Sequence, residues 1–474
     1  MRLILTITSA VLLILSFPSF NLEFLAWVAL VPLFLAIENK KPFKAFLIAY
    51  LFGVLFFLGT IYWLIHVTLP GMILVVLYLA LYFGLFGLVA SYGLRVTGYG
   101  LLFFIPAAWV TLEWLRSTGP AGFGWSLLAH SQSFNLPIIQ IADITGAYGV
   151  SFLVVMANVM AFLAVKNFKG ISRVIIPMVI CGLLISSALI YGYVRLNNIF
   201  TGERVKVAVI QGNIPQAKKW DYNFRDEILN KYEGLTREAL KEKPDLVIWP
   251  ETSVPGYLGR ERDLSERMKT LAKDIKTPLL VGAPREDEVM KDKYYNSAIL
   301  LLEDGRIIDR YDKLHLVPFG EYIPFEDIFS FVEKFAETPI GDFTGGRDYT
   351  VFKFFIERSS KDKDAIWRLV KKVKFSSLIC FEDIFPGLAR EFVRNGADFL
   401  VNITNDAWFG KSSAPYQHAQ SSVFRAVENR VNIVRAANTG LSCFIDQKGR
   451  VIDSVEADGA DLFIDGFKSS EIVL

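Results

Sequence analysis

The sequence predicts two folds in one chain: an α-helical, multi-span membrane domain over residues 1–200 and a layered α/β domain over residues 201–474. Charge gives the first indication, because the first 200 residues contain 14 charged side chains and the remaining 274 contain 84. Periodicity gives the second, because long apolar runs change near residue 205 to short strands that alternate with amphipathic helices. With 53% hydrophobic residues and a net charge of +2, the chain is not disordered, and its charge gives no reason to expect nucleic acid as a partner. Its three cysteines are too few for a fold built on disulfides.

The first 200 residues contain about seven apolar segments. A membrane-spanning helix needs about 20 apolar residues. Four runs reach that length, and they cover residues 43–64, 72–94, 144–165 and 172–194. The run 99–115 is near the lower limit, whereas 3–17 and 24–37 are short. These two either cross the membrane at a tilt or form a hairpin that does not fully cross.

Lysine and arginine in the predicted loops indicate how the membrane domain is oriented. With seven crossings, the short loops on one side contain only Arg116, and the other side collects Arg2, Lys40, Lys41, Lys44, Arg95, Lys166, Lys169 and Arg173. Positively charged loops stay cytoplasmic, so the N-terminus is expected inside. An odd number of crossings then places the second domain outside the cytoplasmic membrane, and a hairpin of the two short runs keeps the same parity.

Two acidic residues, Glu113 and Asp143, lie at or near the ends of apolar segments on the predicted outer side. A carboxylate is costly at membrane depth, which makes both residues candidates for function. The alternative is that they lie at the level of the lipid headgroups and are solvated.

Beyond residue 200 the pattern predicts an alternating α/β domain. Strands are expected at 205–214, 245–251, 278–284, 297–302, 306–312, 375–383, 397–406 and 432–446, and helices at 222–242, 262–275, 386–395 and 415–430. The turn Glu303-Asp304-Gly305 joins two of these strands into a hairpin. The polar stretch 357–373 is expected to be a surface excursion.

Three chemically useful residues follow apolar strands in this domain. Glu251 follows the second strand, Lys313 follows the hairpin, and Cys380 follows Leu378 and Ile379 in the strand at 375–383. A cysteine can act as nucleophile, a partly desolvated carboxylate can take its proton, and a lysine can stabilise an oxyanion. The pattern alone leaves plain alternatives open, since a cysteine at a strand end is often a small core residue and a lone Glu or Lys is often solvated or ion-paired. The sequence has no GxSxG, HExxH or CxxC motif, and its four histidines are scattered, so no zinc site is expected.

Three segments decide between these readings: WPET, YDKLHLVPFGEYIP and LICFED, in that order. They resemble the signature segments of the nitrilase (carbon–nitrogen hydrolase) superfamily. The resemblance implies a four-layer αββα sandwich and a catalytic triad of Glu251 as general base, Lys313 as oxyanion stabiliser and Cys380 as nucleophile. The apolar first domain and several further motifs resemble the apolipoprotein N-acyltransferase branch: VIQGNIPQAKKWD, WVTLEWLR, ITGAYGVSF and NDAWFGKSSAPYQHAQ.

The same resemblance implies further site residues. Glu321 matches an additional carboxylate that positions Lys313 or the base, and the backbone N–H of Phe381 would complete an oxyanion hole. A second group matches positions near the loops where lipid enters, and its members are Trp220, Glu382 and Trp408. The chain departs from the family pattern in having Phe381 where tyrosine is familiar, and in ending at GFKSSEIVL where a last spanning helix is expected.

The branch resemblance implies an enzyme of the bacterial cytoplasmic (inner) membrane with its catalytic domain, 201–474, on the periplasmic side. The expected reaction moves an acyl chain from a phospholipid donor, through a Cys380 thioester, to the α-amine of the N-terminal diacylglyceryl-cysteine of a prolipoprotein. We expect no cofactor, no metal and no nucleic-acid partner. We also expect the protein to be a monomer. Two alternatives are a membrane-tethered amidase of the nitrilase type and a non-catalytic membrane scaffold; an intact Glu251–Lys313–Cys380 set argues against the second.

Overall fold

The computed structural model describes residues 1–95, 100–119, 122–167, 174–288, 290–318, 320–322, 342–359 and 368–474. Contacts divide the chain into two compact units. The membrane unit consists of Met1–Asn198 together with Ser412–Glu428, and the catalytic-domain unit consists of Ile199–Lys411 together with Asn429–Leu474. The first division falls close to residue 200, where the composition of the sequence changes.

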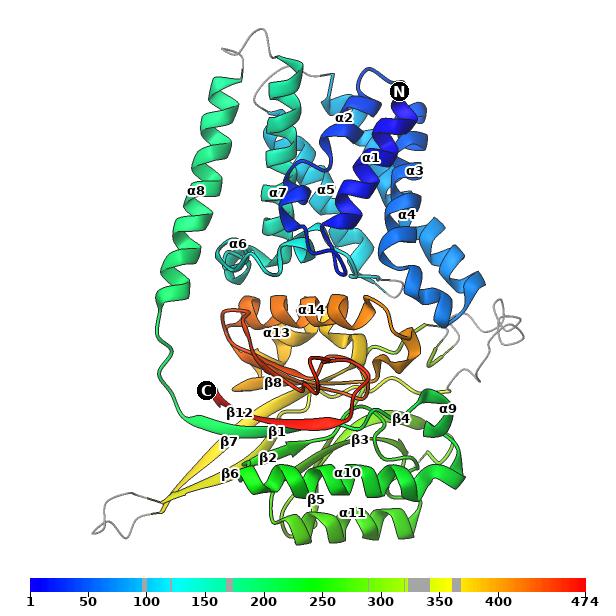
Figure 1. Ribbon diagram of the computed structural model, residues 1–474, viewed down its shortest axis with the longest axis vertical. Coiled ribbons are helices and arrows are strands. Elements are labelled where there is room, and N and C mark those ends of the chain that lie inside the picture. Colours follow the sequence, from blue (N-terminus) through cyan, green and yellow to red (C-terminus); the bar gives the residue numbers. More distant parts are fainter. Residues whose placement is uncertain are drawn as a thin grey trace. The chain divides into compact units, whose positions relative to one another are not determined.

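The membrane unit is a bundle of apolar helices (Figure 1). Four of them are long and apolar enough to cross a membrane: α3 (Pro42–Thr60), α4 (Leu69–Gly93), α7 (Ala142–Lys166) and α8 (Ile175–Asn197). The run predicted near the lower limit forms α5 (Leu101–Ser117). The two short runs form α1 (Arg2–Leu15) and, after a 3₁₀ turn at Glu23–Trp27, α2 (Val31–Ile37). A 3₁₀ turn at Leu128–Gln132 and the short helix α6 (Leu136–Ile139) connect α5 to α7.

Helix α14 (Ala414–Asn429) joins the membrane unit although it lies late in the sequence. Gln417 makes the main connection, because its Oε1 accepts hydrogen bonds from the indole N–H groups of Trp63 at 3.1 Å and Trp125 at 2.9 Å. Helix α7 is kinked at Gly146, where φ is +66°, and Glu428 accepts the hydrogen bond of the next N–H, that of Ala147, at 3.0 Å. Buried polar contacts therefore hold α14 against the apolar helices.

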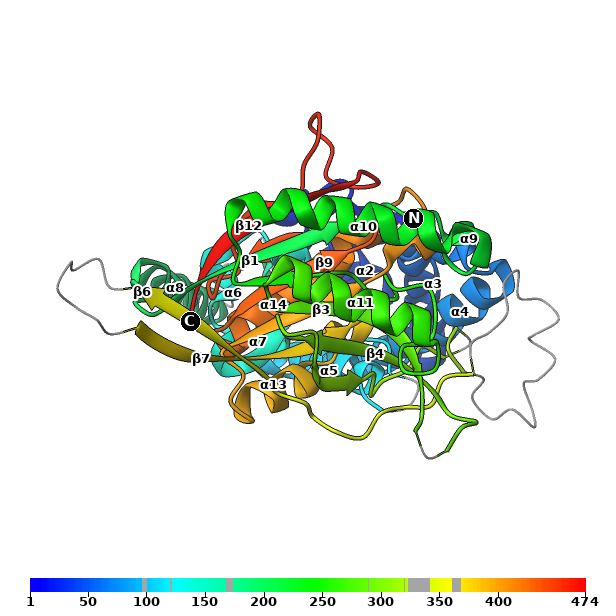
Figure 2. The ribbon, with the colours of Figure 1, turned by 90° about the horizontal axis from the view of Figure 1, so that it is seen from below.

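The catalytic-domain unit contains two six-stranded sheets (Figure 2). The first has the order β12-β1-β2-β3-β4-β5, and its strands are β1 (Arg204–Gln211), β2 (Leu246–Ile248), β3 (Leu279–Glu286), β4 (Tyr294–Leu301), β5 (Ile307–Asp312) and β12 (Gly466–Val473). Strands β1, β2 and β3 are parallel, and the outer strands are antiparallel to their neighbours. Helices α10 (Arg225–Ala239) and α11 (Arg262–Ile275) bury their apolar faces against this sheet in one hydrophobic core.

The second sheet repeats this plan with the order β11-β10-β9-β8-β7-β6. Its strands are β6 (Phe352–Ser359), β7 (Arg368–Ile379), β8 (Phe399–Thr404), β9 (Asn432–Ala437), β10 (Cys443–Ile445) and β11 (Val451–Ser454). Strands β7, β8 and β9 are parallel, and helix α13 (Pro386–Arg394) packs on β7 and β8. The sheets face each other, with β1 against β9 and β4 against β7. The layers therefore run helix, sheet, sheet, helix, and the predicted fold class is confirmed.

Three details differ from the sequence prediction. The single strand expected at 432–446 is two strands, β9 and β10, with a connection at 438–442. The expected surface excursion at 357–373 lies partly in the paired strands β6 and β7, where exposed Lys372 alternates with buried Val373, and residues 360–367 lie outside the described residues. The helix expected at 415–430 forms, but its contacts assign it to the membrane unit, because its face toward that unit carries side chains that pair with Trp63 and Trp125.

Candidate active site

The predicted nucleophile lies at a strained turn. Strand β7 ends at Ile379, and Cys380 begins a 3₁₀ turn (Cys380–Ile384) with φ at +55°, a backbone conformation that residues other than glycine rarely adopt. The side-chain amide of Asn402, on the neighbouring strand β8, donates a hydrogen bond to the Cys380 carbonyl at 2.9 Å. The thiol is buried, and it faces the charges of Glu251 and Lys313. The contact with Asn402 thus helps to hold the main chain of the strained turn.

Lys313 brings the two predicted carboxylates together. It follows β5 and is almost completely buried, and its Nζ lies 2.9 Å from Glu321 Oε1 and 3.4 Å from Glu251 Oε1. Burial opposes the charge of a lysine, but Glu321 and Glu251 more than offset it, so the pKa of Lys313 is raised. Lys313 therefore stays charged at neutral pH and can stabilise negative charge beside it.

Sequence reasoning missed Asn296, which lies on β4 between the two carboxylates. Its Nδ2 donates to Glu251 Oε1 and to Glu321 Oε1, each at 2.8 Å. Because ionised carboxylates only accept hydrogen bonds, the amide nitrogen of Asn296, and not its oxygen, must face them. The only signal in the sequence is a polar side chain inside an apolar strand, and that signal does not distinguish a site residue from a satisfied core residue.

Glu382 lies behind the nucleophile turn and is fully buried. Its carboxylate accepts hydrogen bonds from the Tyr311 hydroxyl and from the main-chain N–H groups of Ile379, Leu314 and His315, at 2.8 to 3.0 Å. Burial raises the pKa of Glu382 to about 7, although these donors act to lower it. The residue thus connects the turn after β7 with the segment after β5, which carries Lys313.

The thiol is held in its neutral form. Burial and the negative charge of Glu251 raise the pKa of Cys380 well above its ordinary value, while Lys313 acts to lower it. The pKa of Cys443, in β10, is also raised by burial, to about 12, but this thiol is fully buried in a strand. Only Cys380 has a base and a lysine beside it within the part of the chain that the structure describes.

The remaining predicted residues lie around this centre. Phe381 follows the nucleophile directly, and its ring lies 5.4 Å from Lys313 Nζ. Trp220 follows the short helix α9 (Gln216–Lys219) and is 53% exposed. Trp408 is half-buried in the 3₁₀ turn Asp406–Phe409, after β8. In the described ranges no cluster of three His, Cys, Asp or Glu is arranged to hold a metal ion.

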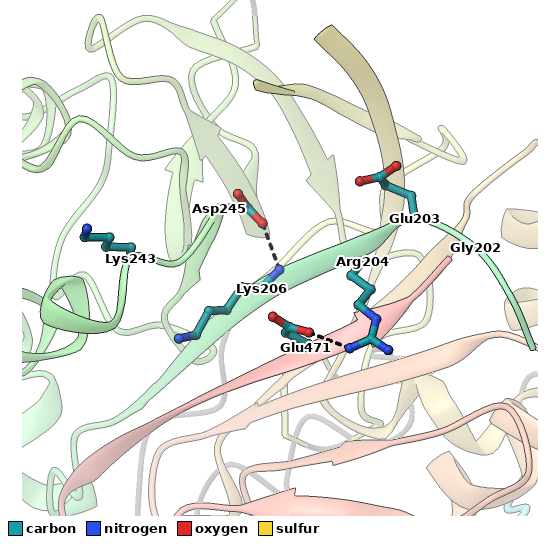
Figure 3. Close-up of a pocket in the computed structure, with 7 residues that line it drawn as sticks. All are labelled: Gly202, Glu203, Arg204, Lys206, Lys243, Asp245 and Glu471. Atoms are coloured by element: carbon teal, nitrogen blue, oxygen red, sulfur yellow. Dashed lines mark hydrogen bonds and ion pairs between the residues drawn. The ribbon is translucent and has the colours of Figure 1, made fainter. Parts of the chain in front are cut away.

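A surface hollow of about 450 Å³ lies elsewhere on the catalytic-domain unit, at the outer ends of β1 and β12 (Figure 3). It is lined by Gly202, Glu203, Arg204, Lys206, Lys243, Asp245 and Glu471. Arg204 pairs with Glu471 at 3.1 Å, and Asp245 accepts a hydrogen bond from the Lys206 main chain at 2.8 Å. Its charges are balanced and none of the predicted site residues lines it, so the chemistry is expected at Cys380.

Comparison with known proteins identifies the family of each part of the chain. Residues 9–160 match the model of the apolipoprotein N-acyltransferase N-terminal domain, and residues 206–468 match that of carbon–nitrogen hydrolases. Among solved structures, Nit3 of Saccharomyces cerevisiae, from the nitrilase superfamily, is 20% identical with a TM-score of 0.41, covering 58% of this chain and 92% of its own. An amidase from Nesterenkonia sp. is 18% identical with a TM-score of 0.40, and the match covers 58% of this chain and 92% of the amidase.

Curated relatives extend the match to nearly the whole chain. Apolipoprotein N-acyltransferase of Geobacter metallireducens is 42% identical over 94% of this chain and 86% of its own length, and that of Chlorobaculum tepidum is 33% identical over 94% and 87%. The fold and the site define a membrane protein that carries a carbon–nitrogen hydrolase domain. The chain belongs to the apolipoprotein N-acyltransferase family.

Proposed function

We propose that this chain transfers an acyl chain from a membrane phospholipid to the α-amine of the N-terminal diacylglyceryl-cysteine of a lipoprotein. Membership in the N-acyltransferase family supports a lipid and a lipoprotein as the substrates. The observation that carries the mechanism is the group of Glu251, Lys313 and Cys380 at the ends of three strands, with Lys313 Nζ 3.4 Å from the Glu251 carboxylate.

In the first half-reaction, Cys380 forms a thioester. Glu251 takes the proton of the thiol as the sulfur attacks the ester carbonyl of the phospholipid, and Lys313 with the N–H of Phe381 stabilises the oxyanion. The C–O bond then breaks, Glu251 returns the proton to the departing oxygen, and a lysophospholipid leaves. Glu321 keeps Lys313 charged and in place through the contact at 2.9 Å.

In the second half-reaction, the neutral α-amine of the lipoprotein attacks the thioester. The C–N bond forms and the C–S bond breaks, and Glu251 moves the proton from the nitrogen to the departing sulfur, which restores the thiol. An amide is more stable than a thioester, so the transfer needs no further energy source. Water competes with the amine for the thioester, and exclusion of water from the buried thiol favours transfer over hydrolysis.

We further propose where the chain works. The lysine and arginine distribution supports a protein of the bacterial cytoplasmic membrane, with residues 201–474 forming the catalytic domain on the periplasmic side. We expect this protein to act as a monomer. The apolar helices of the membrane unit confine the enzyme to the bilayer, where both substrates are held. Trp220 and Trp408, with their partly exposed rings, are the proposed lipid contacts. Glu382, which was predicted together with them, is fully buried and bonded to main-chain N–H groups, so we do not propose it as a lipid contact.

The test is the mass of the Cys380 peptide after incubation of the purified protein with phospholipid. We expect an acyl adduct on Cys380 that is absent in Cys380→Ala and retained in Cys443→Ala, a matched control because Cys443 is also buried. Absence of the adduct in the wild-type protein would overturn the proposal. A diacylated lipopeptide with a free amine should discharge the adduct to a triacylated product, and discharge to free fatty acid alone would indicate a hydrolase.

A further inference from the structure

A second lysine, Lys219, reaches the active site. It ends the short helix α9 and is 2% exposed, whereas the side chain of its neighbour Lys218 is 39% exposed and pairs with Glu227 at 3.0 Å. A buried ammonium is costly unless it has polar or charged partners. Lys219 Nζ donates a hydrogen bond to the main-chain carbonyl of Glu251 at 2.8 Å, and the charged groups that act on it are Glu251 and Cys380.

The charges of the site show why a second lysine matters. Lys313 is committed to two carboxylates, those of Glu251 and Glu321. With one lysine and two carboxylates the site is already negative before the thiol loses its proton. By contrast, the hydrogen-bond partner of Lys219 is a neutral carbonyl, and among the described residues no carboxylate lies within 4.0 Å of its Nζ. Its charge therefore acts on the base and on the nucleophile through space.

We propose that Lys219 is a positioning residue of the acyl transfer, which fixes the Glu251 main chain and supplies the second positive charge that stabilises Cys380 as it becomes negative. The proposal deepens the proposed function and rests on it for the role of Cys380. Lys219 is separate from the triad, because it lies on the segment after β1, whereas the triad residues follow β2, β5 and β7.

Protonation of Lys219 is coupled to that of the nucleophile. Burial lowers the pKa of Lys219 to about 7, and the Glu251 carboxylate and a thiolate at Cys380 act in the opposite direction. Coupling is reciprocal, so a thiolate at Cys380 draws a proton onto Lys219, and a protonated Lys219 favours the thiolate. The other groups that act on Cys380 are Glu251 after β2, Lys313 after β5, and Thr404 and Asp406 at the end of β8.

The experiment measures the rate constant for alkylation of Cys380 by iodoacetamide, in the full-length protein in detergent, from pH 6 to pH 9. Thiolate is the reactive form, so the rate reports the pKa of the thiol. In Lys219→Met we expect alkylation about tenfold slower at pH 6, which corresponds to about one pKa unit. The difference should narrow as the pH rises above 7, because wild-type Lys219 then loses its own proton. Lys218→Met, the matched control, should follow the wild-type profile.

Two more variants separate charge from packing. Lys219→Arg keeps the charge and should stay within about threefold of the wild-type rate at pH 6, whereas Lys219→Gln keeps a donor without charge and should follow Lys219→Met. Lys219→Gln also serves if Lys219→Met does not fold. A wild-type profile in Lys219→Gln, or equal slowing in Lys219→Arg, would overturn the proposal. Alkylation requires no lipid, so the result is distinguishable from a failure to form the acyl adduct.

Discussion

Two buried charges of the membrane unit, Arg116 and Glu113, have different partners from the buried lysine of the active site. In the membrane unit, Arg116 on α5 donates from its guanidinium to the main-chain carbonyls of Phe123 at 2.9 Å and Trp125 at 2.8 Å, and Glu113 accepts the N–H of Leu128 at 2.7 Å. In the active site, by contrast, the buried Lys313 contacts the carboxylates of Glu251 and Glu321.

This difference separates charges that hold the backbone from charges that can react. A main-chain carbonyl or N–H does not titrate, so Arg116 and Glu113 fix the loop between α5 and α7. Groups that face other titratable groups shift one another's pKa, and such shifts cluster at functional sites. Glu113 is not solvated at the level of the lipid headgroups, because it is buried and its carboxylate accepts a hydrogen bond from the backbone. Asp143 differs from Glu113, because it pairs with a charged side chain, that of Arg195, at 3.0 Å.

Among the substitutions that test this difference between the two units, Lys313→Met is expected to have the largest effect. The substitution removes the positive charge beside the nucleophile and leaves two carboxylates facing each other. We expect the rate of acyl-adduct formation on Cys380 to fall about 10²- to 10³-fold, the loss that follows removal of one oxyanion donor. Mass spectrometry of the Cys380 peptide over time measures it. A rate within a few-fold of wild type would show that the proposed oxyanion stabiliser is another group.

The corresponding change in the membrane unit is Arg116→Met. It leaves buried carbonyls without donors, so we expect a loss of about 3 kcal/mol in the free energy of unfolding, seen as a lower melting temperature in detergent. Molecules that remain folded should form the acyl adduct at the wild-type rate. The exposed Lys44→Met in the same unit is the control and should melt with the wild type. A slow but stable Arg116→Met would show that this arginine takes part in the reaction.

The pH dependence of the nucleophile gives a sharper test of the site. Burial and Glu251 raise the pKa of Cys380 above its ordinary value of 9.0, so the thiol is neutral at pH 7 and gains charge only as the pH rises. The rate of alkylation by iodoacetamide should therefore increase with pH through pH 9 without a plateau. Asp406→Asn removes a negative charge that acts on the thiol and should raise the rate at pH 8, by about threefold. A plateau below pH 8 would contradict the raised pKa.

Much of the fold could be predicted from composition and periodicity. The helix expected at 262–275 is α11 with the same bounds, and the hairpin around Gly305 is β4 and β5. Strands with one exposed face were missed or misjudged: β6 and the start of β7 contain many lysines, and β12 contains Lys468, Ser469 and Ser470 on a strand that pairs with β1. The grouping of α14 with the membrane unit depends on contacts far apart in sequence, which periodicity does not report.

The site could be predicted only where residue type and motif coincided. Glu251, Lys313, Cys380 and Glu321 all stand in signature segments, and the structure brings them together. Asn296 stands in none of the quoted motifs, and its relevance depends on distances across strands. Lys219 stands in the motif VIQGNIPQAKKWD, but the sequence does not distinguish it from the adjacent Lys218, which is the same residue type. Only burial separates the two lysines, because Lys219 is buried and Lys218 is partly exposed.

The smallest effect is expected at charges that are exposed. Arg204, in the hollow of Figure 3, pairs with Glu471 at 3.1 Å, but the side chains are 71% and 53% exposed. Exposed ion pairs typically stabilise by no more than about 1 kcal/mol, because water and salt screen them. Arg204→Gln should therefore change the melting temperature by less than about one degree, and acyl-adduct formation should match the wild type. If Arg204→Gln instead slowed adduct formation as much as Lys313→Met, the hollow would contribute to the reaction although its charges are exposed.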